Sequence, residues 1–206
     1  MLERKNFPGR KLLLTGHGRC NITNKKLPRE LRMGYHEAGS FIYSALNKFS
    51  PSDAIEFIEN ELGVDLKEED NNRMFPVTDK AQTILDALVD YIGSENIVTD
   101  FNVVDMDDTG SGHEIYAADG RVMTFDKVIF ACGGRSFPQT GSDGSSYKLV
   151  REMGHTVTPL IPALSAVEVT SDDRVFTAAV SGVSVNAGAS LYYDNSKKAS
   201  GEGDVL

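Results

Sequence analysis

Tryptophan is absent from this chain, cysteine and histidine are scarce, and long apolar runs are missing. The 206 residues include two cysteines and four histidines. Cys20 and Cys132 lie far apart and neither belongs to a Cys-x-x-Cys pair, so the spacing of a zinc site is missing and we expect no metal. No apolar segment approaches the roughly 20 residues of a transmembrane helix, and the N-terminus lacks the apolar core of a secretory signal. This pattern favours a protein of the reducing cytoplasm.

Positive charge is also in short supply. Lysine and arginine total 21 against 30 acidic residues, which gives a net charge of −9. No dense basic run interrupts this balance, which argues against nucleic acid or an anionic membrane surface as a partner. The hydrophobic share of 40% and charged share of 25% are typical of a globular protein. The length suits one domain, or one domain and part of a second.

Three familiar sequence motifs do not occur. The chain contains no G-x-G-x-x-G fingerprint, no G-K-[ST] phosphate loop and no G-x-S-x-G nucleophile turn. Gly16-His-Gly18 does not replace the fingerprint, because no third glycine follows and no helical period begins there. Glu3, at the end of an apparent strand, stands where a Rossmann domain places the acid that binds a ribose. That spacing would put the glycine fingerprint before Met1.

Two glycine-rich turns follow apolar runs. Leu12–Leu14 is expected to be the end of a short strand that breaks at Gly16 and Gly18. Lys127–Cys132 is expected to be a buried strand that ends at Gly133 and Gly134. Strands that end in such turns build ligand sites in α/β proteins, although each turn is also compatible with an ordinary loop.

Helical periodicity dominates the chain between residues 36 and 93. Apolar residues at spacings of three and four predict three helices, over residues 38–49, 51–62 and 81–92. The first is expected to bury one face, made of Ala38, Phe41, Ile42, Ala45, Leu46 and Phe49. Ser50 with Pro51 marks the start of the second helix, Thr78 is expected to cap the third, and Gly93 to end it. Residues 25–35 are basic and expected to be irregular.

Strand patterns follow the third helix. Ile97-Val98, Val103-Val104, Ile115–Ala117 and Arg121–Phe125 predict a β-meander, with Asp119-Gly120 as a hairpin turn. A short helix is expected after Asp143. Beyond Ala163 the alternation of apolar and polar residues indicates a β-rich second domain. We therefore expect a first domain over residues 1–162 and a second over residues 163–206.

Several of these stretches together resemble a known family. Thr15-Gly-His-Gly-Arg-Cys-Asn-Ile-Thr-Asn24 is similar to the G-G-G-R-C-N-x-T-N signature of bacterial FAD-dependent oxidoreductases of the aminoacetone-oxidase-like and bile-acid-reductase-like type. Glu3-Arg-Lys5 looks like the end of that family's second Rossmann strand, and Met74–Lys80 and Ala131–Gly134 match further phrases of the family, in order. His17 stands where the family usually has glycine, and Cys132 where it has threonine.

The resemblance implies an α/β fold, with a partial Rossmann-like FAD-binding domain of the two-dinucleotide-binding type, a β-meander and the start of an inserted β-rich domain. It also implies that the chain is an internal fragment of such an enzyme. The residues expected to bind FAD by this resemblance are Glu3, Lys11, Gly16, Gly18, Arg19, Cys20, Asn21, Val104, Ala131, Gly133 and Gly134.

The implied function is an FAD-dependent oxidoreductase, linked to NADH or NADPH and acting on a small organic substrate. Arg19 is the expected electrostatic contributor, because a fixed cation favours an anionic reduced flavin. His17 and His155 are candidate acids, although a structural role fits each better, and no catalytic residue is assigned. Two alternatives stay open: a nucleotide-binding module without redox activity, and an inactive fragment that lacks the diphosphate-binding glycines.

Overall fold

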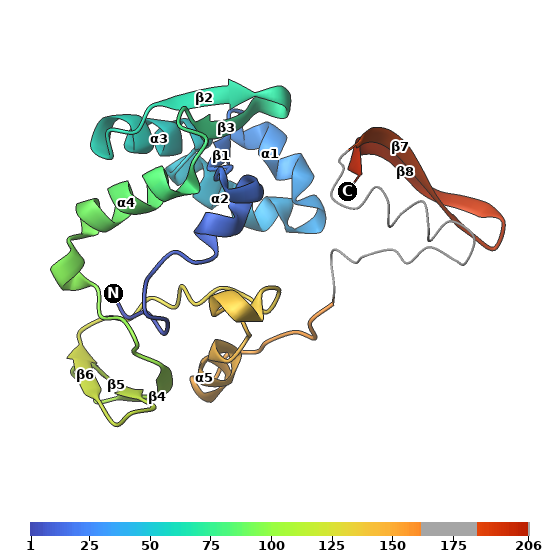
Figure 1. Ribbon diagram of the computed structural model, residues 1–206. Helices are drawn as coiled ribbons and strands as arrows, with labels where there is room; N and C mark the ends of the chain where they lie inside the picture. The colour runs from blue at the N-terminus through green and yellow to red at the C-terminus, as the bar shows by residue number, and fades with distance from the viewer. Residues whose placement is uncertain (162–184, 206) are drawn as a thin grey trace, which may run out of the picture. The chain divides into compact units, whose positions relative to one another are not determined.

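A computed structural model describes residues 1–161 and 185–205 (Figure 1). The chain divides into two units, Met1–Val157 and Thr158–Leu206, which are described separately. The domain boundary expected at residue 162 borders a stretch outside the described residues and stays a prediction.

Two three-stranded antiparallel sheets and several helices make up the first unit, which confirms the α/β class. One sheet has the order β1-β3-β2 and the other the order β4-β5-β6 (Figure 1). The strands are β1 Thr23–Asn24, β2 Leu66–Glu69, β3 Arg73–Pro76, β4 Val103–Asp108, β5 His113–Ala117 and β6 Val122–Phe125. The helices are α1 Pro28–Gly34, α2 Gly39–Lys48, α3 Pro51–Glu56, α4 Ala81–Ile92 and α5 Ser146–Glu152.

The expected meander is present as the sheet of β4, β5 and β6, but Ile97-Val98 is not a strand of this sheet, because Val98 bridges to Leu2 instead. Gly120 has a φ of +90° in the turn between β5 and β6, which a glycine adopts without steric cost. Phe101, Ile115 and Ala117 form the buried core of this part, and Val98 and Val128 pack against it.

A second core lies under helix α4. Its buried members are Cys20, Ile58, Val64, Ala81 and Ile84. Gly93 ends α4 as expected, with a φ of +80°. The expected Thr78 cap is wrong: Lys80 holds the N-cap position, and the Thr78 hydroxyl instead lies 2.7 Å from that of Thr83.

Local capping was predicted correctly at α3. The Ser50 hydroxyl accepts the Asp53 N–H at 3.2 Å, and the Asp53 carboxylate accepts the Ser50 N–H at 2.7 Å. This reciprocal box satisfies two backbone donors at the helix start. The helix continues from Phe57 to Glu61 as a π-helical turn, η3.

Residues 25–35 are not irregular. Pro28 begins helix α1, and the Glu30 carboxylate accepts the Leu27 N–H at 2.8 Å. Proline has no N–H to lose at the first helical position, so here it starts a helix instead of breaking one.

Helix α2 forms where expected, but its predicted apolar face is largely uncovered. Phe41 is 87% exposed and Phe49 58% exposed, while Ile42 and Leu46 are half-buried. The contact with α1 runs through Gly39, where a Cβ atom would lie 2.3 Å from the Arg32 carbonyl oxygen. The close contact at this glycine sets which side of α2 faces α1.

The two expected strands beside the glycine turns are absent. Leu12–Gly18 forms a 3₁₀ segment, η1, broken at Thr15. Leu12 and Leu13 pack against the core under α4, and this packing replaces a strand partner. Residues 127–132 form no strand, and Ile129 is 90% exposed. A buried parallel strand needs paired neighbours and covered faces, and no described segment pairs with these residues.

One parallel contact joins the start of the chain to residues 98–101. Leu2 forms a parallel bridge with Val98. The Glu3 N–H donates to the Val98 carbonyl at 2.9 Å, and the Phe101 N–H donates to the Glu3 carbonyl at 2.9 Å. These bonds fix Glu3 at the end of an extended segment, as its sequence position predicts.

In the second unit the structure describes one long hairpin, β7 Val185–Tyr193 with β8 Ser196–Val205. The alternation expected over residues 189–193 lies within β7. The patterns at residues 166–169 and at 183–184 lie outside the described residues.

The exposure of Ile129 gives a direct test of this fold. We expect Ile129→Asn to change the free energy of unfolding by less than about 0.5 kcal/mol, as for a surface position. Ile115→Ala, in the core of the meander, should cost about 2–5 kcal/mol. Denaturant titration of both variants checks this, and an equal cost at the two positions would mean that residues 127–132 form a buried strand after all.

Candidate functional site

Glu3 presents its carboxylate at the end of the first extended segment. The side chain is half-buried, and one carboxylate oxygen accepts the Lys5 N–H at 2.7 Å. The second oxygen has no protein partner among the described residues. A carboxylate held in this way can accept a hydrogen bond from a ligand hydroxyl.

Arg4 connects this segment to the glycine-rich loop of residues 133–144. Its guanidinium donates to the Asp143 carboxylate at 2.9 Å, to the Ser145 hydroxyl at 3.1 Å and to the Gly141 carbonyl at 3.0 Å. The Ser145 hydroxyl and N–H, followed by the Arg4 guanidinium, hold the pKa of the Asp143 carboxyl far below its usual range.

The loop that Arg4 holds is a tight turn. Phe137 and Ser142 form an antiparallel bridge around the 3₁₀ turn η6, Pro138–Thr140. Ser142 is buried, and its hydroxyl oxygen would lie 2.6 Å from a Cβ atom on Gly133. Gly133 also has a φ of +72°, so both its conformation and its surroundings exclude a side chain.

Lys11 joins the same loop from the other side. Its ammonium lies 5.6 Å from the centre of the Phe137 ring, within the range of a cation–π contact. Of the expected residues, Gly133 and Gly134 belong to this loop and Lys11 contacts it. Glu3 is connected to it only through its neighbour Arg4.

The turn from Gly16 to Asn21 forms a separate group over Phe75. Gly16, His17, Gly18 and Cys20 all have positive φ angles. A Cβ atom on Gly16 would lie 2.8 Å from the Asn21 nitrogen and 2.9 Å from the Phe75 ring. His17 and Cys20 are not glycines, and a left-handed backbone at such residues is costly. It persists only where the surrounding structure holds it.

Arg19 is held in a network of ion pairs. Its guanidinium lies 2.8 Å from the Glu69 carboxylate, 3.3 Å from that of Asp79 and 4.3 Å from the centre of the Phe75 ring. The Arg19 hydrogen bond lowers the pKa of Glu69, and the Lys67 hydrogen bond is the main cause that lowers the pKa of Asp79. Because two carboxylates offset its charge, Arg19 would act on a nearby flavin less strongly than a free cation.

The remaining expected residues lie apart from these groups. The Cys20 side chain is 4% exposed within the core under α4, and this burial raises the pKa of its thiol. Only its backbone can face a ligand. Val104 is 41% exposed, at an irregularity of β4, and Ala131 is exposed. The cofactor roles of all these residues stay predictions.

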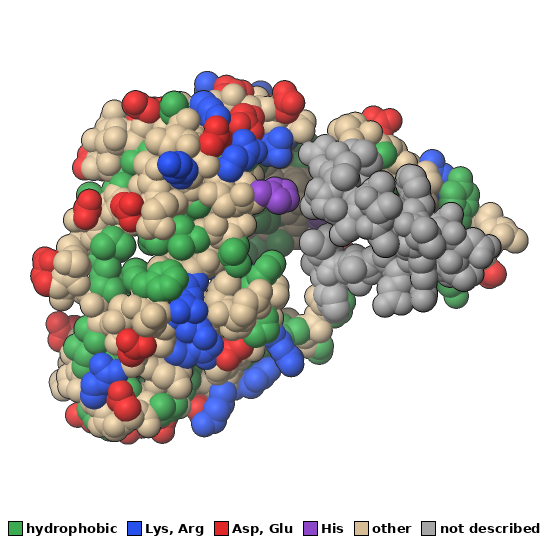
Figure 2. Space-filling view, viewed as in Figure 1, with side chains coloured by type: hydrophobic (Ala, Val, Ile, Leu, Met, Phe, Trp, Pro, Cys, Tyr) green, Lys and Arg blue, Asp and Glu red, His purple; other side chains and the backbone are tan. Residues whose placement is uncertain are grey.

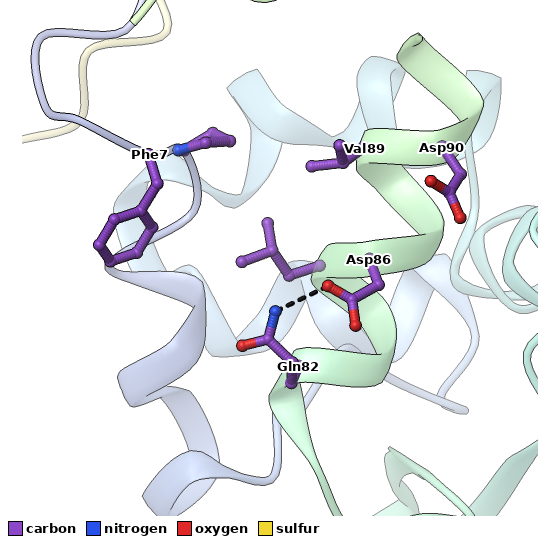
Figure 3. Close-up of a pocket in the computed structure, with 7 residues that line it drawn as sticks. Phe7, Gln82, Asp86, Val89 and Asp90 are labelled. Carbon is purple, nitrogen blue, oxygen red and sulfur yellow. Dashed lines mark hydrogen bonds between the residues drawn. The ribbon is translucent and has the colours of Figure 1, made fainter. Parts of the chain in front are cut away.

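A hollow of about 610 Å³ lies between the Phe7-Pro8 turn and helix α4 (Figure 3). Gln82, Asp86 and Asp90 line its α4 side, with Gln82 donating to the Asp86 carboxylate at 2.7 Å. It contains none of the residues expected from the sequence. Within the described part of the chain, no helix is long and apolar enough to cross a membrane, and no cluster of three acidic, histidine or cysteine side chains could hold a metal.

The sequence predicts a strand end at Glu3-Arg-Lys5 but no role in the site for Arg4 or Lys5. Both lie directly after Glu3, yet Arg4 bonds to residues 137 to 141 positions away. The one available signal was the excess of basic residues near the start of the chain.

The two glycines of the Gly16–Gly18 turn provide a matched stability test. Gly16→Ala should cost about 2–4 kcal/mol, because it adds a clash with Phe75 to the strain of a positive φ. Gly18→Ala meets only the Leu13 carbonyl oxygen at 3.8 Å, so it should cost only about 1 kcal/mol. Denaturant titrations of the two variants measure this difference, and equal costs would rule out the close packing on Phe75.

A family model and two curated relatives match most of this chain. The family model of the HI0933-like protein Rossmann domain matches residues 1–198. The chain is 36% identical over 171 residues to the 3-dehydro-bile acid delta(4,6)-reductase of Clostridium scindens, which covers 82% of this chain and 41% of that relative. It is 30% identical over 163 residues to the ribosomal RNA dihydrouridine synthase of Escherichia coli, which covers 77% of this chain and 39% of that relative.

The chain thus spans about two fifths of the length of these curated relatives, both of which carry enzyme names. The family match extends over nearly the whole chain, from the Glu3 segment through the glycine-rich loop and into the second unit. The chain belongs to the family of HI0933-like proteins with a Rossmann domain.

Proposed function

We propose that this chain forms part of the FAD-binding domain of a flavoprotein oxidoreductase. The observation that carries the proposal is the half-buried Glu3 carboxylate, which lies at the end of a parallel contact and is tied through Arg4 to the glycine-rich loop. In Rossmann domains an acid at this place binds a ribose hydroxyl. The reductase name of the Clostridium relative supports the redox class.

The residues at the loop fit a dinucleotide. Glu3 would accept a hydrogen bond from the ribose of the adenosine half, and Gly133 would present its backbone to the cofactor in the left-handed conformation that glycine adopts without steric cost. Lys11 would add a positive charge near the phosphates. When bound, FAD supplies the capacity to accept and donate a hydride.

The Gly16–Asn21 turn is the proposed wall on the flavin side. Here the Gly16 and Gly18 backbone and the Asn21 amide would contact the ring system, while the ion pairs of Arg19 keep the turn in place. Cys20 would contribute only backbone, since its side chain belongs to the core. Val104 and Ala131 would offer backbone groups to the cofactor.

NADH or NADPH is the proposed electron donor, and a small organic molecule the proposed substrate, in the cytoplasm. The alternatives without redox activity remain a nucleotide-binding module and an inactive fragment. The nucleotide-binding module would bind flavin without its reduction by NADH or NADPH, and the inactive fragment would not bind flavin.

Flavin binding and reduction test this proposal together. The purified chain should bind added FAD, and NADH or NADPH should bleach the visible flavin absorbance under anaerobic conditions. Glu3→Gln should weaken FAD binding about tenfold through loss of a charged hydrogen bond, while the exposed control Glu37→Gln should leave it unchanged. FAD that binds without being reduced would favour the nucleotide-binding module, and protein that ignores FAD would favour the inactive fragment.

The net charge argues against nucleic acid as a partner, but a second candidate substrate is RNA, in line with the name of the Escherichia coli relative. Residues 1–36 hold nine lysines and arginines against two acidic residues, whereas the remaining 170 residues hold twelve against 28. Lys26, just before α1, and Arg29, in α1, are exposed, and so is Phe41 in α2. Cations beside exposed aromatic rings are the combination that single-stranded nucleic acid requires.

A charge reversal at these two cations tests the RNA candidate. Binding of a labelled uridine oligonucleotide should weaken at least about tenfold in the double variant Lys26→Glu, Arg29→Glu, because two phosphate contacts are lost. The matched reversal Lys197→Glu, Lys198→Glu on the β7–β8 hairpin should change binding less than about twofold. Equal losses in the two double variants, or no binding by the unmodified chain, would exclude this segment as an RNA surface.

A further inference from the structure

Helix α4 forms one wall of the hollow beside the Phe7-Pro8 turn (Figure 3). Leu85 and Val89 supply apolar surface on this wall, and Phe7 and Pro8 supply it on the other side. The volume of about 610 Å³ is within the range of ligand pockets. None of the residues expected to bind FAD lines the hollow, so the proposed cofactor site leaves it without a role.

Two carboxylates at this hollow lack a cation. Asp86 and Asp90 lie one turn apart on α4, which contains no lysine or arginine (Figure 3). Asp86 accepts a hydrogen bond from Gln82 at 2.7 Å, but within the described residues neither carboxylate forms an ion pair. Like charges at this spacing repel each other, and Asp90 also lies in the last turn, where the helix dipole disfavours a negative charge. A cation at the hollow would offset both effects.

Helix α2 carries the opposite combination of charge and apolar surface. Its ten residues include one lysine, Lys48, and no aspartate or glutamate. Phe41, Ala45 and Lys48 share one face by helical spacing, and all three are exposed. Phe41 is 87% exposed, which leaves a large aromatic side chain in water without a packing partner. Burial of this ring in an apolar environment would be favourable.

Arg32 of α1 adds a second cation to α2. Its guanidinium donates to the Ser40 hydroxyl at 3.0 Å and lies 5.2 Å from the centre of the Tyr43 ring. Among the residues that the structure describes, no carboxylate pairs with Arg32 or Lys48. In a chain with a net charge of −9, α2 is thus a local exception. A helix face that combines an aromatic anchor with a cation suits an apolar groove with an acidic wall.

We propose that helix α2 of one copy of this chain docks in the hollow beside α4 of a second copy. Phe41 would enter the apolar part of the hollow, and Lys48 would pair with Asp86 and Asp90. Both surfaces belong to the unit Met1–Val157, so a second copy supplies each surface with the charge that it lacks. The contact joins two different surfaces, and copies therefore associate head to tail.

Analytical ultracentrifugation of the full chain tests this contact. The unmodified chain should self-associate at about 10–100 μM, in the affinity range of a small, partly polar interface. The double variant Asp86→Lys, Asp90→Lys should weaken this association at least about tenfold, because it places like charges opposite each other. The double variant Phe41→Ser, Lys48→Glu should weaken it to a similar extent, because it removes the anchor and reverses the charge of α2.

A matched control separates a specific contact from an effect of total charge. Glu56 and Glu61 are exposed on the segment α3–η3. The double variant Glu56→Lys, Glu61→Lys changes the net charge as much as the reversal at Asp86 and Asp90 does. It should change the association less than about twofold. Thermal unfolding of each variant shows that folded proteins are compared.

A mixture of the first two double variants tests the head-to-tail geometry. The variant at Asp86 and Asp90 keeps an intact α2, and the variant at Phe41 and Lys48 keeps an intact hollow. Each variant alone should be monomeric, but together they should form a 1:1 heterodimer. This heterodimer should not grow further, because its two remaining surfaces are the altered ones.

Three results overturn this inference. A chain that stays monomeric up to about 100 μM would leave α2 and the hollow to another occupant, such as a different polypeptide. Equal weakening in the control at Glu56 and Glu61 would mean that total charge governs the association. A mixture that forms no heterodimer would mean that the copies meet through other surfaces. The measurements need no flavin, so their outcome is separate from that of the proposed function.

Discussion

The three hydrogen bonds of Arg4 bring together segments that the sequence separates by about 140 positions. They join the extended segment of Glu3 to the glycine-rich loop before helix α5. The pair with Asp143 is partly exposed, with side-chain exposures of 25% and 36%, so its contribution to stability is modest. Its importance is geometric, because a planar guanidinium with several fixed donors can set the relative position of two chain segments. The proposed ribose contact depends on that position.

A different cation, Arg19, organises the other end of the first unit. It stacks on Phe75, a side chain that is 1% exposed, and pairs with Glu69 and Asp79 from the β2–β3 region (Figure 2 shows red and blue side chains mixed there). Gly16 packs on the same ring. This end of the unit is thus electrically balanced and tightly packed, whereas the loop near Arg4 carries a surplus of positive charge.

Features governed by neighbouring residues could be predicted from the sequence. Helix α4, the Ser50 capping box and the Asp119-Gly120 turn follow rules that act over a few positions. Features that depend on a distant partner could not. Residues 127–132 have the composition of a buried strand, but a strand requires neighbours, and Ile129 stays exposed without them. Leu12 and Leu13 likewise pack on the core under α4 instead of pairing.

The same distinction applies to the candidate site. Glu3 and Gly133 could be proposed because a carboxylate after a strand and a glycine after an apolar run are local signals. Arg4 and Lys5 stand beside Glu3 in the sequence, but their significance comes from Gly141 and Asp143. The net charge was similarly uninformative, because a total of −9 conceals the basic residues at the start of the chain. A phosphate responds to the local field within about 10 Å at moderate salt, and that field is set by which side chains the fold brings together.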